Sequence, residues 1–332
     1  MANDIFAGKR VLVTGGTGML GMALVELLLQ RSAHVRVTSL DDPRHLPESV
    51  EFIRLDLTKW DDCLQACGGI DHVFHLAGIK GGVGIGRTRA ADFLEANGFM
   101  SLHMLKAARE CNVDKYLYTS SIGVYPDVEV FKEDEVWDKP PHPSDRYAAW
   151  AKRIGELQCE AYLEQHDYKT CIVRPATIYG PYDNFDPETA MVIPALINRV
   201  CSREDPLVVW GDGSQVRDFI YSKDCAMGMI MVMENYYECD PINLGSGVGV
   251  SIRDIVQTIC RHAPFDPLVE WDTSKPVGNK IRLMDMTKAR KALGFHPNHS
   301  LEEGIKETIE WYLTNKEYQS GRYSVFGRTS AP

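Results

Sequence analysis

One short segment, TGGTGMLG at residues 14–21, constrains the fold of this 332-residue chain more than any other stretch. An apolar run typical of a buried strand precedes it, and a segment with helical apolar spacing follows it. Gly15, Gly18 and Gly21 allow a tight turn between the two and let the backbone approach a pyrophosphate at the helix N-terminus. The segment therefore predicts the first strand–turn–helix unit of a dinucleotide-binding domain; a glycine turn without a ligand is the alternative.

Short apolar segments alternate with helix-length segments over the first 180 residues. The expected strands are 11–13, 33–40, 50–57, 71–78, 115–121 and 169–180, and the expected helices are 19–29, 89–110 and 145–166. This alternation predicts an α/β fold, a Rossmann doubly wound parallel sheet. Further helical segments at 251–262, 286–293 and 301–315 predict a smaller α/β C-terminal domain.

The domain boundaries follow from the loss of this regular alternation after about residue 181. We expect residues 1–181 to form the NAD(P)-binding Rossmann domain, together with a returning segment at about 218–246. Residues 182–217 and 247–325 are then expected to form the second domain, which binds the substrate.

Composition excludes several classes of protein. The formal net charge is −10 and no basic stripe is present, so nucleic acid is not an expected partner. The nine cysteines are scattered and form no CxxC pair, which favours reduced thiols and predicts no metal site. No apolar run is long enough to cross a membrane, and the first residues lack a hydrophobic signal region. We therefore expect a soluble, cytoplasmic protein.

The end of the second strand bears on the choice between NAD and NADP. An acidic residue there would hold the ribose 2′-OH of NAD, whereas an arginine would favour the 2′-phosphate of NADP. The sequence has Asp41 and Asp42, followed by Arg44, and so allows either cofactor, with NAD slightly favoured. Asp56, after the third strand, is a candidate for the adenine edge; an ordinary strand-end cap is its alternative role.

Several motifs occur in order along nearly the whole chain: TGGxGxxG, DL after the third strand, FHLAG, SSIGVY, the helix of Lys152, and RPATIYGP. With them the chain resembles the extended short-chain dehydrogenase/reductase family, also called the NAD-dependent epimerase/dehydratase family. The resemblance implies an enzyme that binds NAD or NADP, acts on a nucleotide sugar and forms a homodimer. Within the family, GPYDNFDPETAMVIPALINR, LVVWGDGSQVRDFIY and DTSKPVGNK are most similar to GDP-L-fucose synthases, which favours a GDP-sugar.

The resemblance also implies the residues of both ligand sites. The expected cofactor-binding residues are Gly15, Thr17, Gly18, Met19, Leu20, Asp41, Asp56, Leu57, Leu76, Ala77, Thr119, Lys152, Pro175 and Ile178. The expected substrate-binding residues are Ser121, Asn184, Val192, Arg199, Trp210, Arg217 and Lys275. Residues 78–87, GIKGGVGIGR, are expected to form a loop over the sugar.

The catalytic pattern of the family is complete except at one position. Ser121 matches the family's serine or threonine, and Lys152 matches its lysine, but Ala148 occupies the tyrosine position. On a regular helix Ala148 and Lys152 lie roughly 40° apart, whereas Tyr147 points roughly 140° away from Lys152. Tyr147 would reach the site only if a π-bulge added a residue to that turn.

Three explanations of Ala148 remain open. The alanine is an engineered replacement, or the acid/base function has moved to another residue, or the protein binds its nucleotides without turning them over. The candidates for a moved acid/base residue are Tyr147, Tyr125 and Tyr182. We favour the first two explanations and expect this chain to be a slow enzyme.

Two other positions narrow the reaction. The cysteine and histidine with which fucose synthases epimerise carbons 3 and 5 are replaced by Gly123 and Met191, which cannot exchange a proton with a carbon acid. The acidic residue of the dehydratases is missing as well, since Ile122 and Gly123 fill that stretch. Hydride transfer at a single sugar carbon remains, as in a 4-epimerase or a 4-ketoreductase. The alternative function is a non-catalytic dinucleotide-binding sensor of the same fold.

Overall fold

The computed structural model describes residues 4–79, 88–186, 188–275 and 278–321, without the side chains of 319–321. Its largest sheet has seven parallel strands in the order β11-β7-β5-β4-β1-β2-β3. These strands are β1 (Arg10–Thr14), β2 (His34–Thr38), β3 (Glu51–Ile53), β4 (His72–His75), β5 (Lys115–Thr119), β7 (Cys171–Pro175) and β11 (Ile242–Leu244). The strand order reverses between β1 and β4, which confirms the predicted doubly wound α/β fold.

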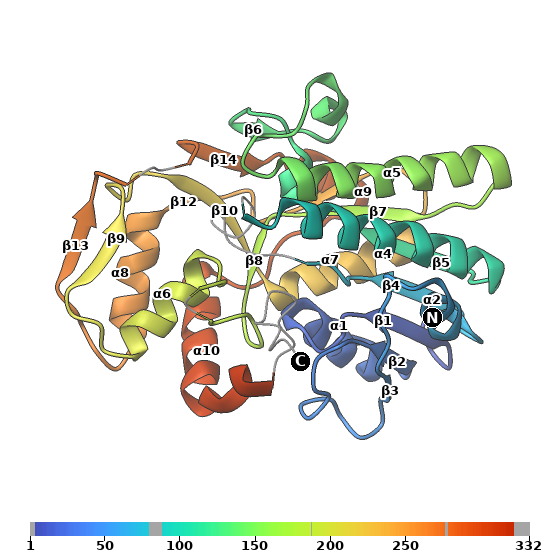
Figure 1. The fold of residues 1–332 in the computed structure, drawn as a ribbon, viewed down its shortest axis with the longest axis horizontal. Coiled ribbons are helices and arrows are strands. Elements are labelled where there is room, and N and C mark those ends of the chain that lie inside the picture. Colours follow the sequence, from blue (N-terminus) through green and yellow to red (C-terminus); the bar gives the residue numbers. More distant parts are fainter. Residues whose placement is uncertain (1–3, 80–87, 187, 276–277, 322–332) are drawn as a thin grey trace.

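Helices cover both faces of this sheet (Figure 1). One layer contains α1 (Met19–Gln30), α7 (Ser222–Asn235) and α9 (Thr287–Leu293), and the other contains α2 (Trp60–Cys67), α4 (Ala90–Glu110) and α5 (Arg146–His166). The apolar residues of each layer form a separate buried cluster with the side chains of the sheet. Because both faces are covered, the central strands are buried along most of their length, as their near-continuous apolar sequences predict.

A second group of elements lies beside this sheet, on the left in Figure 1. A five-stranded sheet contains β6 (Val130–Phe131), β8 (Thr177–Tyr179), β10 (Val216–Tyr221), β12 (Gly249–Ser251) and β14 (Ile281–Met284). A two-stranded sheet pairs β9 (Leu207–Trp210) with β13 (Val269–Asp272). The helices of this group are α6 (Val192–Cys201), α8 (Ile252–His262) and α10 (Leu301–Thr314), and their apolar faces share a third buried cluster. Short 3₁₀ turns form η1 (Ile122–Val124), η2 (Glu133–Asp138) and η3 (Lys316–Gly321).

The expected strands and helices are present, and the sheet strands are shorter than expected at their ends. One expected strand, residues 169–180, is divided in two: β7 stays in the main sheet, and β8 leaves it to pair with β10. The returning segment is divided in the same way, because β10 joins the second sheet while α7 and β11 join the first. The proposed division into two domains stays a prediction.

Candidate active site

The glycine turn joins β1 to α1 at the carboxyl edge of the main sheet. Gly15 has a φ of +67°, and its N–H donates to the Thr38 carbonyl at the end of β2, 2.7 Å away. A Cβ atom on Gly21 would lie 2.5 Å from the Gly15 carbonyl oxygen, so only glycine lets the helix pack this closely on the turn. The turn thus has the close backbone approach that a pyrophosphate site requires.

The first turn of α1 faces the same edge. Gly18 precedes this helix in an extended conformation and has no side chain to cap it. The N–H groups of the first helical residues, Met19 and Leu20, have no partner within a helix, and they are the groups that bind phosphate in this arrangement. Thr17 fixes the turn from inside by donating to Ser39 Oγ, 2.7 Å away. The turn therefore fits a dinucleotide.

The end of β2 carries both acidic and basic groups. Asp41 Oδ2 lies 3.5 Å from Thr17 Oγ1, close to the glycine turn. Arg44 is paired with Asp42 through Nη2, 2.7 Å from Oδ2. Arg54, which the sequence reasoning did not single out, donates to the Leu40 carbonyl over 2.6 Å. A ribose at this end of the site would meet a carboxylate with two arginines nearby.

The end of β4 is held against the glycine turn by one hydroxyl group. Thr14 Oγ1 accepts hydrogen bonds from the backbone N–H groups of Leu76 and Ala77, each over 3.0 Å. Its own hydrogen therefore points to His75 Nδ1, 2.9 Å away. Burial, reinforced by the Lys152 charge, lowers the pKa of His75 to about 3, so the imidazole is neutral. His75 is thus a buried strand-end residue, and its bond explains how Leu76 and Ala77 reach the expected cofactor edge.

Lys152 lies one strand further along the same edge. Its Nζ donates to the backbone carbonyl of Thr119 at the end of β5, 2.8 Å away. A Cβ atom on Gly78 would lie 3.5 Å from Nζ, so the ammonium also faces the segment that follows β4. Burial lowers the pKa of Lys152 from 10.5 to about 8, although the Glu156 carboxylate opposes this shift. Lys152 is therefore a cation placed between two strand ends, as a nicotinamide-ribose ligand would be.

Buried hydroxyl groups surround this cation. Thr119 Oγ1 and Ser120 Oγ are buried and have no hydrogen-bond partner among the residues that the structure describes. Unpaired buried polar atoms are uncommon in native proteins. The predicted contact of Thr119 with a cofactor would give one of these atoms a polar neighbour.

Asn97 of α4 is a residue that the sequence reasoning missed. Its Oδ1 accepts from the Ile79 N–H over 2.9 Å, and its Nδ2 donates to the carbonyls of Ile79 and Phe93. The side chain is only 2% exposed and fixes the backbone that follows β4 near Lys152. An asparagine on an apolar helix face was the signal in the sequence, because such a group is buried only with partners.

Ser121 follows β5 and begins η1. Its Oγ accepts from the Gly123 N–H over 3.1 Å. A Cβ atom on Gly123 would lie 3.5 Å from Ser121 Oγ and 3.8 Å from the carboxyl carbon of Asp145. Ser121, Gly123 and Asp145 therefore form one surface, and Asp145 is a second residue that the sequence reasoning missed.

The expected tyrosine position contains a methyl group in the structure as well as in the sequence. Ala148 is half-buried on α5, which is α-helical throughout Arg146–His166 without the extra residue of a π-bulge. Tyr147 is 44% exposed and packs against Arg146, whose guanidinium carbon lies 5.7 Å from the ring centre. The structure therefore does not bring Tyr147 together with Ser121 and Lys152.

The other two tyrosines considered as acid/base residues have structural partners. Tyr125 is fully buried and donates to Asn243 Oδ1 over 2.5 Å, and burial raises the pKa of its hydroxyl well above the usual value. Tyr182 packs between Trp311 and Tyr318, with ring centres 4.6 and 5.7 Å away. Neither ring has a contact with Ser121 or Lys152 among the interactions that the described residues make.

Two arginines stand side by side across from Asp145. Arg217 on β10 is in register with Arg282 on the parallel strand β14. Arg282 Nη2 lies 3.1 Å from Asp145 Oδ2. Burial, together with the Arg282 charge, lowers the pKa of Arg217 to about 10, and Asp145 opposes this shift. The sequence reasoning found Arg217 but not Arg282, because strand register is not visible in the sequence.

The remaining predicted substrate residues are placed less uniformly. Arg199 pairs with Glu204 and donates to the Val208 carbonyl over 2.7 Å, so its guanidinium holds the α6–β9 connection. Asn184 is used in a local turn, where Nδ2 donates to Thr189 Oγ1 over 2.7 Å. Trp210 is 60% exposed with Lys275 Nζ 6.0 Å from its ring centre. Only Trp210 and Lys275 of this group remain available to a ligand in the way the prediction requires.

Other predicted residues lie at element ends. Asp56 accepts hydrogen bonds from the backbone N–H and hydroxyl of Thr58, which is the strand-end cap considered as its alternative role. Leu57 is buried beside the α2 layer. Pro175 ends β7, Ile178 lies in β8, and Val192 begins α6. Of the predicted loop over the sugar, residues 80–87 lie outside the described residues.

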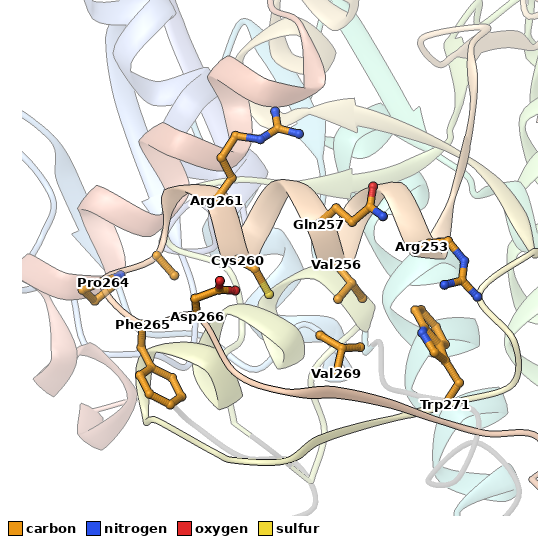
Figure 2. A pocket seen from close by; sticks show the side chains of 11 residues that line it. Arg253, Val256, Gln257, Cys260, Arg261, Pro264, Phe265, Asp266, Val269 and Trp271 are labelled. Carbon is orange, nitrogen blue, oxygen red and sulfur yellow. The ribbon is translucent and has the colours of Figure 1, made fainter.

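A separate concave surface lies on the second group of elements. It follows α8 and the segment leading to β13, with Phe265 at one end and Arg253 packed on Trp271 at the other (Figure 2). The guanidinium carbon of Arg253 lies 4.5 Å from the Trp271 ring centre. None of the predicted cofactor, catalytic or substrate residues lines this surface.

Two searches of the described residues gave negative results. No group of three or more His, Cys, Asp or Glu side chains there is arranged to hold a metal ion. Likewise, none of the helices in that part of the chain combines the length and the apolar character needed to span a bilayer.

Comparisons with known proteins agree with this geometry. Residues 11–245 match the model of the NAD dependent epimerase/dehydratase family. The chain is 33% identical over 326 residues to GDP-L-fucose synthase of Escherichia coli (strain K12), covering 93% of this chain and 98% of that protein. The structure of UDP-glucose 4-epimerase with UDP-glucose from Thermotoga maritima is similar, with a TM-score of 0.81, 28% identity and coverage of 93% and 100%. A GDP-L-fucose synthetase from Naegleria fowleri bound to NADP has a TM-score of 0.80, 27% identity and coverage of 96% and 95%.

Proposed function

We propose that this chain, which belongs to the NAD dependent epimerase/dehydratase family, is a nucleotide-sugar enzyme that transfers a hydride at a single sugar carbon. Its reaction is that of a 4-epimerase or a 4-ketoreductase. The observation that carries the proposal is the position of Lys152, whose ammonium is bonded to the Thr119 carbonyl two residues before Ser121. The glycine turn and this lysine lie at carboxyl ends of strands of the same parallel sheet, where such folds bind their ligands.

Each element of the chain has a role in this reaction. The glycine turn and the start of α1 bind the pyrophosphate, and Asp41 binds the adenine-side ribose. Lys152 holds the nicotinamide ribose, and Ser121 donates a hydrogen bond to the reacting sugar oxygen. When bound, the nicotinamide supplies or accepts the hydride. NAD is slightly favoured over NADP because of Asp41, although Arg44 and Arg54 stand nearby.

The substrate side supports an anionic ligand. Arg217 and Arg282 place two guanidinium groups next to each other in a protein of net charge −10. Planar guanidinium groups suit the oxygens of a diphosphate. Trp210, exposed beside Lys275, offers a flat surface to a nucleotide base. The GDP-L-fucose synthase relatives favour guanine as that base.

A homodimer is the proposed assembly. Large apolar side chains are exposed on α4 and α5, which lie side by side along one edge of the molecule (Figure 1). They are Leu94, Phe99, Leu102, Tyr147, Trp150, Ile154 and Leu157. A continuous apolar surface of this kind marks an interaction site, and two such helix pairs would pack as a four-helix bundle. This surface also explains the outward position of Tyr147.

The experiment that tests the function is turnover of nucleotide sugars observed by NMR. The protein is incubated with NAD or NADP and with GDP- and UDP-sugars that carry a hydroxyl or a ketone at carbon 4. Ala148→Tyr is assayed in parallel, because a tyrosine at this position restores the family's pattern beside Lys152. We expect slow conversion by the natural sequence and faster conversion by the variant. If neither protein converts any of these sugars, the proposed function is wrong.

The second candidate function is a dinucleotide sensor without catalysis. The combination of Ala148, Gly123 and Met191 favours it, because none of these side chains transfers a proton. A sensor binds the dinucleotide but has no affinity for nucleotide sugars. Calorimetry distinguishes the two: micromolar binding of a GDP-sugar to the cofactor-loaded protein contradicts the sensor.

A further inference from the structure

We propose that Asp145 exchanges the proton of the sugar hydroxyl or ketone in this protein, at the position left without a tyrosine by Ala148. The inference rests on the proposed function and names the acid/base residue that the family's tyrosine would otherwise be. Four features of the structure support it: the helix face on which Asp145 stands, the direction of its carboxylate, the groups that hold it, and the space beside it.

Asp145 stands on the same side of α5 as the two key positions of the family. It immediately precedes the helix and accepts the first helical hydrogen bond, from the Ala149 N–H over 2.8 Å. Ala148 follows three residues later and Lys152 seven residues later, and these separations place all three on one helix face. Asp145 is therefore one turn closer to the helix start than the empty tyrosine position.

The carboxylate of Asp145 is not used to cap the helix. An aspartate immediately before a helix usually accepts a hydrogen bond from an N–H of the first turn, but Asp145 makes no such bond. Its carboxyl carbon instead lies 3.8 Å from the place that a Cβ atom on Gly123 would occupy. The same Cβ atom would lie 3.5 Å from Ser121 Oγ. The carboxylate and the Ser121 hydroxyl thus border one space, which is open because residue 123 has no side chain.

One oxygen of Asp145 is held and the other is available. Oδ2 accepts from Ser144 Oγ over 3.2 Å and lies 3.1 Å from Arg282 Nη2. Oδ1 accepts no hydrogen bond from any described residue. Arg217 stands beside Arg282 in register on the neighbouring strand, so the diphosphate side of the site begins directly behind the carboxylate. This arrangement orients Oδ1 toward whatever lies between Asp145 and Ser121.

The proton transfer balances as follows. In oxidation, the sugar hydroxyl gives its proton to Asp145 Oδ1 while the hydride on the same carbon passes to the oxidised nicotinamide, and a C=O bond forms. In reduction, the carbonyl carbon receives the hydride from the reduced nicotinamide, and the protonated Asp145 returns its proton to the oxygen. Ser121 donates a hydrogen bond to that oxygen in both directions. Lys152 exchanges no proton with the sugar and holds the cofactor ribose.

The test compares Asp145→Asn, Ala148→Tyr and the double variant with the natural sequence. Loss of the acid/base group is expected to lower kcat by about 10²–10⁴-fold in Asp145→Asn. The double variant is expected to recover turnover, because the introduced tyrosine supplies the missing proton. Asp92→Asn is the matched control, since Asp92 also begins a helix and also lies 3.1 Å from an arginine, Arg89.

A binding measurement separates a catalytic Asp145 from a merely structural one. Calorimetry on the cofactor-loaded protein compares GDP with GDP-mannose. We expect Asp145→Asn to change the affinity for GDP-mannose while the affinity for GDP stays as in the natural sequence, because the carboxylate faces the sugar. Equal losses for both ligands, wild-type turnover by Asp145→Asn, or failure of the double variant to recover would each overturn the role of Asp145 alone. Absence of turnover in the natural sequence and in Ala148→Tyr would overturn the proposed function together with it.

Discussion

The hydroxyl of Tyr318 donates to the backbone carbonyl of Thr17, 3.2 Å away and 301 residues earlier in the chain. The same hydroxyl lies 3.2 Å from the Tyr182 carbonyl. A residue of the last described turn thus reaches the glycine turn, and its ring packs against His45 and Trp311, with ring centres 5.2 and 4.9 Å away. The proposed cofactor site therefore depends on residues from both ends of the chain.

Tyr318→Phe removes this hydroxyl and keeps the ring. We expect the free energy of unfolding to fall by ~1 kcal/mol, the usual worth of one hydrogen bond, and dinucleotide affinity to fall with it. Chemical denaturation and calorimetry measure the two effects. Tyr168→Phe is the control, because Tyr168 also donates to a backbone carbonyl, that of Val113, over 3.0 Å. Equal loss of dinucleotide affinity in both variants would contradict a specific role of Tyr318.

Lys152 predicts a pH dependence of stability. Its pKa is about 8 in the folded protein and 10.5 in the unfolded chain, so between these values the unfolded state binds more protons. Stability that depends on this group therefore rises as the pH increases from about 8 to about 10.5. Relative to Lys152→Met, the natural sequence should gain at most ~3 kcal/mol across this window. Urea denaturation of both proteins at several pH values measures the difference, and a constant difference would refute the prediction.

Asp41 is expected to set the choice of cofactor. Asp41→Asn removes the carboxylate that stands 3.5 Å from Thr17 Oγ1 and leaves Arg44 and Arg54 in place. A 2′-phosphate is then repelled less, so the ratio of NADP to NAD affinity should increase by about tenfold, as expected for one charge at the ribose. Calorimetry with both dinucleotides measures the ratio. Asp61→Asn on α2 is the control, and a ratio that does not move in Asp41→Asn excludes Asp41 from the ribose site.

The apolar surface of α4 and α5 predicts the effect of a charge placed on it. Leu157 is 52% exposed there, and Leu157→Glu would bury an unpaired carboxylate in the proposed dimer. We expect the variant to be monomeric in sedimentation equilibrium at concentrations at which the natural sequence is a dimer. Leu268→Glu serves for comparison, since Leu268 is 65% exposed in the segment before β13. A natural sequence that sediments as a monomer would show the dimer proposal to be wrong.

Two helical glycines predict opposite effects of alanine. A Cβ atom on Gly155 of α5 would lie 2.2 Å from the Tyr118 hydroxyl, which itself donates to the Lys152 carbonyl over 3.3 Å. Gly155→Ala should therefore destabilise the protein by about 1–3 kcal/mol through overpacking and displace Lys152. Gly98→Ala on α4 meets nothing within 4 Å and should stabilise by ~0.5–1 kcal/mol. Thermal denaturation measures both, and a neutral Gly155→Ala would contradict the close packing of α5 on β5.

Much of the fold could be predicted because its signals are local. The glycine turn, the apolar strands and the helix periodicity each depend on residues close together in the sequence, and the sheet order follows from the rules that connect such units. For the same reason Ala148 could be recognised as the missing tyrosine from its distance to Lys152 alone. The proposed positions of Ser121 and Lys152 also need only the ends of two neighbouring elements.

The tertiary structure decided which charged groups meet. Arg282 comes to stand beside Arg217 only through the register of β14 with β10, and Asp145 faces both because α5 packs across η1. Arg199 looked available in the sequence, but its fork is closed by Glu204 and the Val208 carbonyl. Sequence determines periodicity, turns and the residue types at strand ends, since these depend on local backbone geometry. Which side chains share a partner depends on packing between distant segments, and that is the part only the folded chain provides.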